Sequence, residues 1–165
     1  MCLPAFIAVM PEPVLPFDEN TVLTTARDLH DAARVRAVAP LLAGKHLCVL
    51  GEAVDGRDCK AFIEAARELG AQVTALHPGQ LALRTPADVT RCAGVLGRLY
   101  DAVECQGVAP GLVHDLGEAA AIPVYDGLAC EAHATAALAA RLDVDAPEAI
   151  RRRRVLQAML VGSLA

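Results

Sequence analysis

The feature that most constrains the fold is a regular alternation of short apolar runs with segments of helical periodicity. The runs are continuously apolar over a few residues, as in a strand that is buried on both faces. Between the runs, apolar residues recur at three- and four-residue spacing, which is typical of helices. We expect strands at 46–50, 71–76, 102–105 and 122–125, and helices at 57–69, 86–99, 111–120 and 131–142.

Strands that alternate with helices of this length form βαβ units with parallel strands. The pattern therefore predicts an α/β fold, a three-layer sandwich with a four-stranded parallel sheet, doubly wound, plus a docked C-terminal helix. Ligands of such sheets bind beyond the carboxyl ends of the strands. Functional residues are therefore expected in the loops that follow the strands.

The two ends of the chain depart from this alternation. Residues 1–20 are expected to form an extended N-terminal arm, because they contain Pro11, Pro13 and Pro16. Their apolar start lacks the basic residues of a secretory signal, so we do not predict one. Residues 21–142 form the α/β domain, which opens with a helix at 21–39. Residues 143–165 are predicted to be a linker and a C-terminal helix of the same domain, with its arginines mostly in solvent. A helix on a membrane surface is the alternative.

Composition excludes several classes of partner. The chain of 165 residues has a net charge of -5 and 3% aromatic residues, which argues against a nucleic-acid surface. No apolar stretch is long enough to span a membrane. The six cysteines form no C-x-x-C pair and are expected as free thiols in the cytoplasm.

Several segments, in the same order, resemble the carbamoyl-phosphate-binding domain of the ornithine and aspartate carbamoyltransferases, the ornithine branch more closely. They are Leu42-Ala43-Gly44-Lys45, the run FIEAARELG at 62–70, the segment 95–103, and Pro123-Val124-Tyr125-Asp126-Gly127-Leu128 with His133. The terminal helix resembles the one that closes the family's chain. Only 143–147 stand where the family has its amino-acid-binding domain, which implies an internal deletion.

The resemblance implies that the phosphate site of this family has changed. The family's Ser-x-Arg-Thr-Arg motif, at the N-terminus of the first helix after the first strand, aligns with Asp55, Gly56, Arg57, Asp58 and Cys59. Only Arg57 is retained, and ionised carboxylates cannot donate hydrogen bonds to an anion. Asp55 and Asp58 have the spacing of a helix N-cap and its third residue, so we expect the helix to be capped by its own carboxylate.

The resemblance also implies that the catalytic positions of the family are mostly replaced. Gln106 aligns with an arginine that polarises the carbamoyl carbonyl, and His133 is the one retained residue of the family's His-Pro-x-Gln segment. The resemblance thus assigns Gln106 and His133 to the ligand site, with His133 as a degenerate catalytic residue. On an Ala-rich helix, His133 is interpreted as a residual or hydrogen-bonded histidine.

Cysteines at the same sheet edge suggest other chemistry. Cys59, Cys105, Cys130 and His133 are the residue types of a structural zinc site, but their spacing matches no zinc pattern. We therefore predict neither metal nor cofactor. A reactive thiol at Cys59 is a further alternative, since a helix N-terminus lowers a thiol pKa and the neighbouring Asp58 opposes it.

These observations predict a degenerate single-domain relative of ornithine carbamoyltransferase without carbamoyl transfer activity, acting as a binding or oligomeric scaffold protein. The family implies a homotrimer, and a protein partner is also expected. One alternative is a small-molecule-binding protein or enzyme with a changed, neutral or cationic ligand attracted by Asp55 and Asp58. The other is a carbamoyltransferase half-enzyme that a partner chain completes.

Overall fold

The computed structural model describes residues 18–165, and the predicted arm lies outside this range except for its last three residues. The first helix, α1 (Glu19–Arg34), begins within those three. Asp18 is its N-cap, and its side chain accepts a hydrogen bond from the Thr21 N–H at 2.9 Å. The helix expected at 21–39 therefore begins earlier than its apolar pattern indicates.

The same helix also ends five residues before the predicted boundary. Arg36 adopts a positive φ of 55°, and the Ala37 N–H donates to the Ala32 carbonyl at 2.8 Å. The Arg36 N–H donates to the Ala33 carbonyl, which completes a Schellman motif. The prediction placed the end at Pro40 and Gly44 and was wrong, because a non-glycine residue ends the helix.

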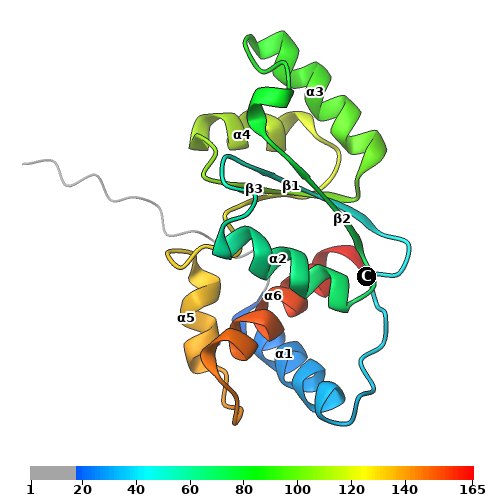
Figure 1. Cartoon of the computed structure of the whole chain (residues 1–165), viewed down its shortest axis with the longest axis vertical. Helices are drawn as coiled ribbons and strands as arrows, with labels where there is room; N and C mark the ends of the chain where they lie inside the picture. The colour runs from blue at the N-terminus through cyan, green and yellow to red at the C-terminus, as the bar shows by residue number, and fades with distance from the viewer. Residues whose placement is uncertain (1–17) are drawn as a thin grey trace, which may run out of the picture.

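Four parallel strands form one sheet, as predicted (Figure 1). In chain order they alternate with helices, and their spatial order is β2-β1-β3-β4, so the chain winds outward in both directions from β1. The elements that follow α1 are β1 (His46–Gly51), α2 (Arg57–Glu68), β2 (Gln72–Leu76), the 3-10 turn η1 (Pro78–Gln80), α3 (Pro86–Leu99), β3 (Ala102–Gln106), α4 (Pro110–Ala119), β4 (Val124–Asp126), α5 (Ala134–Arg141) and α6 (Glu148–Leu164).

The strands bury both faces, and each face has its own core. Leu47 and Val49 of β1 face a core shared with α1, α2, α5 and α6. Cys48 and Leu50 face a second core, which α3 and α4 cover. The alternation follows from the two-residue period of a strand. Figure 1 shows α3 and α4 above the sheet and the other helices below it.

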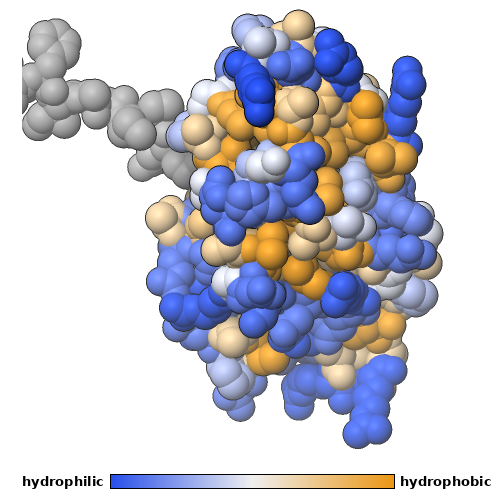
Figure 2. All heavy atoms as spheres, turned by 45° about the horizontal axis from the view of Figure 1, so that its top comes forward, coloured by the Kyte–Doolittle hydropathy of each residue, from blue (hydrophilic) through white to orange (hydrophobic). Residues whose placement is uncertain are grey.

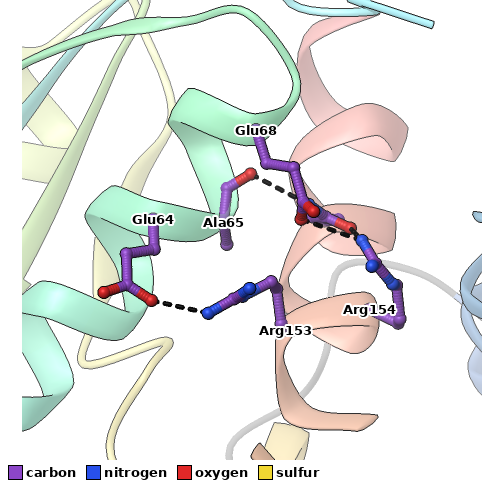
Figure 3. A network of polar contacts seen from close by, with 6 residues as sticks. Glu64, Ala65, Glu68, Arg153 and Arg154 are labelled. Carbon is purple, nitrogen blue, oxygen red and sulfur yellow. Dashed lines mark hydrogen bonds and ion pairs between the residues drawn. The ribbon is translucent and has the colours of Figure 1, made fainter. Parts of the chain in front are cut away.

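The C-terminal helix α6 is docked among α1, α2 and α5, as expected (Figure 1). Its arginines are not mostly solvated, however, because Arg154 is only 5% exposed. Arg154 donates to Glu68 at 2.9 Å (Figure 3). The buried Gln157 donates to the same carboxylate at 2.6 Å. Arg153 pairs with Glu64 at 2.6 Å one turn away. These contacts join α6 to α2 through polar groups as well as apolar packing.

Within residues 18–165, none of the helices has the length and apolar character needed to cross a membrane.

Candidate functional site

The carboxyl ends of β1, β3 and β4 meet at one edge of the sheet, beside the N-terminus of α2. Gly51 ends β1, and a Cβ atom there would lie 2.9 Å from the carbonyl oxygen of Gln106. Only glycine therefore allows β1 and β3 to approach so closely at this point. This edge contains the positions that the resemblance selects.

The predicted carboxylate cap of α2 is absent. The N-cap is Gly56, which has extended backbone angles and offers no side-chain hydrogen bond. Asp55 precedes the cap, and Asp58 is the second helical residue. The reason is a tight turn in which the Gly56 N–H donates to the Ala53 carbonyl at 2.8 Å, and a Cβ on Gly56 would lie 2.9 Å from that carbonyl oxygen. The turn therefore requires glycine at position 56, which is the N-cap, whereas the prediction made Asp55 the N-cap.

Arg57 is the retained basic residue of this segment, and it is paired with an acidic side chain. Its Nη1 lies 3.0 Å from Oε1 of Glu131, in the loop between β4 and α5. Arg152 of α6 approaches the same oxygen at 3.8 Å and donates to the Ala129 carbonyl at 2.7 Å. The loop is therefore bound to α2 and to α6.

A groove of about 750 Å³ lies between α2, this loop and the start of α6. Charged side chains of both signs dominate its lining. They are Asp55, Arg57, Asp58, Lys60, Glu64, Glu131, Glu148, Arg152 and Arg153, with Ala61 and Ala149 between them. The structure therefore brings Asp55, Arg57 and Asp58 of the predicted site together on one open surface.

Gln106 and the partly buried Cys130 lie in a separate cluster around the buried Glu104. Gln106 donates from its amide to Oε1 of Glu104, and the Ala129 N–H donates to the same oxygen at 3.3 Å. The Cys130 thiol donates to the Gln106 side-chain oxygen at 3.2 Å. Gln106 is thus turned inward and satisfied by protein groups.

Glu104 is an acidic residue of this edge that was not among the predicted site residues. It is fully buried, and within residues 18–165 its Oε2 has no hydrogen-bond partner. Burial raises the pKa of this carboxyl from 4.5 to about 8, although hydrogen bonds from the Ala129 and Leu128 backbone and from Gln106 act in the opposite direction. An acid inside an otherwise apolar strand was the signal available in the sequence.

His133 caps α5 rather than facing the groove. Its Nδ1 accepts a hydrogen bond from the Thr135 N–H at 3.2 Å, and it is also 3.1 Å from the Thr135 hydroxyl. Burial lowers the pKa of the imidazole, and the nearby Asp126 opposes this shift. A histidine in this role is a neutral helix cap.

The thiols of the edge have raised pKa values and are not grouped as a metal site. Burial raises the pKa of the Cys59 thiol, with further contributions from Glu104 and Asp58, and this direction is opposite to the shift that an activated thiol would need. Burial also raises the pKa of Cys105 to about 12 and that of Cys130 to about 11. Across residues 18–165 no group of three or more His, Cys, Asp or Glu side chains is placed to hold a metal ion, Cys59, Cys105, Cys130 and His133 included.

Known proteins with a similar sequence are ornithine carbamoyltransferases. That of Cutibacterium acnes is 38% identical over 114 residues, which cover 69% of this chain and 34% of the relative. The catabolic enzyme of Rhizobium meliloti is 36% identical over 124 residues, which cover 75% of this chain and 37% of the relative. The chain thus spans about a third of the length of these relatives. No family model matches it.

Solved structures of the same enzymes share the fold. Ornithine carbamoyltransferase from Pyrococcus furiosus superposes with a TM-score of 0.66 at 29% identity, over 75% of this chain and 40% of the other. The catalytic subunit of aspartate transcarbamoylase from M. jannaschii superposes with a TM-score of 0.57 at 18% identity, over 74% of this chain and 40% of the other, and shows the fold alone. Sequence and fold agree that this chain belongs to the ornithine and aspartate carbamoyltransferase family and represents one part of its longer members.

Proposed function

We propose that the chain is a degenerate relative of ornithine carbamoyltransferase that no longer transfers a carbamoyl group and acts as a binding or oligomeric scaffold protein. The observation that carries this proposal is the charge around Arg57. Asp55 and Asp58 flank it, and its guanidinium is paired with Glu131 at 3.0 Å. A phosphate near these side chains would meet carboxylates, and a like-charge pair about 4 Å apart costs roughly 4 kcal/mol at an effective dielectric constant near 20.

The other two aligned positions support the same proposal. Gln106 is uncharged and bound to Glu104, and His133 is bound to Thr135 as a cap. Carbamoyl transfer depends on preorganised donors and positive groups around the charge that develops in the transition state. Gln106 and His133 already make hydrogen bonds within the protein and supply no permanent positive charge.

The test is a carbamoyl transfer assay on the purified chain with carbamoyl phosphate and ornithine, combined with thermal unfolding. We expect no product and no stabilisation specific to carbamoyl phosphate over inorganic phosphate. A ligand at a hundred times its dissociation constant would add about 2.7 kcal/mol, which for a domain of this size raises the midpoint by roughly 5–10 °C. Product formation by the chain alone would overturn the proposal.

The scaffold role implies a homo-oligomer, and we propose a trimer in the cytoplasm that serves as the platform for a protein partner. Val95 and Leu99 lie one turn apart on α3 and are 49% and 60% exposed. Figure 2 shows apolar patches between hydrophilic side chains on one face of the molecule. Light scattering should give three times the 17.2 kDa chain mass. If the exposed pair of Val95 and Leu99 lies in the interface, Leu99→Asp should reduce the mass of the oligomer.

The second candidate function is a ligand-binding protein or enzyme with a changed small ligand. The groove of about 750 Å³ favours it, because Asp55 and Asp58 line its wall, where carboxylates attract cationic molecules and accept hydrogen bonds from neutral ones. Thermal unfolding against a panel of small amines would detect such a ligand, and Asp58→Ala would remove the response.

A partner chain that completes a half-enzyme is the third candidate, and the observation behind it is that the chain spans about a third of its relatives. Co-purification of a second chain that restores carbamoyl transfer would favour this candidate over the scaffold.

A further inference from the structure

The carboxylate of Glu131 is shared by two arginines from different helices. Its Oε1 lies 3.0 Å from Nη1 of Arg57 on α2 and 3.8 Å from Nη1 of Arg152 on α6. The two guanidinium groups therefore converge on one oxygen atom. That oxygen belongs to the loop between β4 and α5, and all three side chains line the groove.

One of the two arginines is held in place by a second bond. The Arg152 side chain is 16% exposed, and its Nη2 donates to the Ala129 carbonyl at 2.7 Å, two residues before Glu131. The side chains of Arg57 and Glu131 are 81% and 61% exposed. Arg152 is thus held in place by the protein, whereas the carboxylate of Glu131 and the guanidinium of Arg57 can be reached from the groove by an external oxyanion.

We propose that Glu131 is a built-in counter-ion that fills a two-arginine oxyanion site from within the chain. Guanidinium groups bind small oxyanions through paired N–H donors, and a carboxylate uses the same donors. While Glu131 occupies them, an external oxyanion must displace it and also approaches a negative charge. The contact is therefore autoinhibitory. The inference rests on the proposed function, since Arg57 belongs to the same site, but it concerns a residue that the resemblance does not assign.

The remaining charges of the groove define the control. Asp55, Asp58 and Glu148 add negative charge, Lys60 adds positive charge, and Arg153 is paired with Glu64. Within residues 18–165 Glu148 forms no ion pair with an arginine. Glu148→Gln therefore removes the same charge from the same groove without freeing a guanidinium, and it is matched to Glu131→Gln.

The experiment measures inorganic phosphate and sulfate binding to the full chain by titration calorimetry and thermal unfolding. We expect Glu131→Gln to bind phosphate at least tenfold more tightly than the unaltered chain does, and Glu148→Gln to bind no more than twofold more tightly. Adding Arg57→Gln to Glu131→Gln should remove the gain. Glu131→Asp, which keeps the charge on a shorter side chain, should give an intermediate affinity.

Three results would overturn the inference. They are no gain in Glu131→Gln, an equal gain in Glu148→Gln, and failure of Glu131→Gln to fold, which would make Glu131 a structural residue. The proposed function is judged separately, by carbamoyl transfer in the unaltered chain. Activity there overturns the proposed function, whereas absence of a phosphate gain in the variant overturns only the counter-ion.

Discussion

Replacing the buried carboxyl of Glu104 by an amide is expected to remove a pH-dependent loss of stability, so the stability of the variant relative to the unaltered protein should rise with pH. Glu104 is fully buried in β3, and its Oε2 has no hydrogen-bond partner within residues 18–165. Glu104→Gln keeps an oxygen that can accept from Gln106 and from the Ala129 N–H. The amide group takes the position of Oε2, so the shape of the side chain is preserved while its titration is removed.

The magnitude follows from the pKa of Glu104, which burial raises from 4.5 to about 8. The folded state holds the proton over this interval, whereas the unfolded chain releases it, so the stability of the unaltered protein falls as pH rises from 4.5 to 8 and the loss is complete above 8. Each pKa unit corresponds to about 1.4 kcal/mol. Between pH 5.5 and pH 8 the advantage of Glu104→Gln should therefore increase by about 3 kcal/mol.

The assay is urea unfolding of both proteins at several pH values from 5.5 to 8, compared as a difference so that other titrating groups cancel. The neighbours of Glu104 that interact with its charge are Asp126, Cys59, Cys105, Tyr125 and Cys130. The exposed Glu118 of α4 provides the control, because Glu118→Gln removes a carboxyl that is not buried. A difference for Glu104→Gln that stays constant across this pH range would refute the reasoning, since it would mean that Glu104 is ionised in the folded protein throughout.

Three further predictions concern residues in the contact between α2 and α6, in the turn before α2 and in the loop after β4. Gln157→Ala should cost about 2–4 kcal/mol of unfolding free energy in urea, because it leaves a cavity and removes a 2.6 Å hydrogen bond to Glu68. Gly56→Ala should cost roughly 1–3 kcal/mol by the same measurement, because its Cβ would lie 2.9 Å from a carbonyl oxygen in the turn before α2; no loss would show that the turn relaxes freely. Cys130, whose pKa is raised to about 11, should be alkylated by iodoacetamide at pH 8 about a hundredfold more slowly than an ordinary thiol, and rapid labelling in peptide mass spectrometry would contradict the burial of its thiolate.

The layered sheet could be predicted from the sequence because its signal is periodic. The strands begin within two residues of the predicted positions, and alternation along β1 directs Leu47 and Cys48 to opposite cores. Helix ends were less predictable, since Arg36 ends α1 by adopting a conformation that usually selects glycine. The cap of α2 was also misplaced, because Gly56 is required by a backbone contact that has no sequence pattern of its own.

The burial of polar side chains could not be predicted from the sequence, and the reason is physical. A run of four arginines suggests a solvated face, yet Arg154 is buried because Glu68 and Gln157 lie opposite it in α2 and on the next turn of α6. Glu68 is distant from Arg154 in the sequence, and a glutamine such as Gln157 is common in any helix. Only the packing of the helices therefore shows that these residues are partners. The same holds for Glu104, whose bonds come from Gln106 and from a loop that follows β4.

Each aligned polar residue of the candidate site already forms an ion pair or hydrogen bond with a nearby residue of the protein. Arg57 is paired with Glu131, Gln106 is bonded to Glu104, and His133 caps its own helix through Thr135. Any ligand at this edge must break such a contact before it gains one, and burial makes this most costly at Gln106, which is 7% exposed. The exposed pair of Arg57 and Glu131 is the weakest of the three contacts. Binding at this edge should therefore begin at the groove, with displacement of Glu131, rather than at the buried end of the sheet.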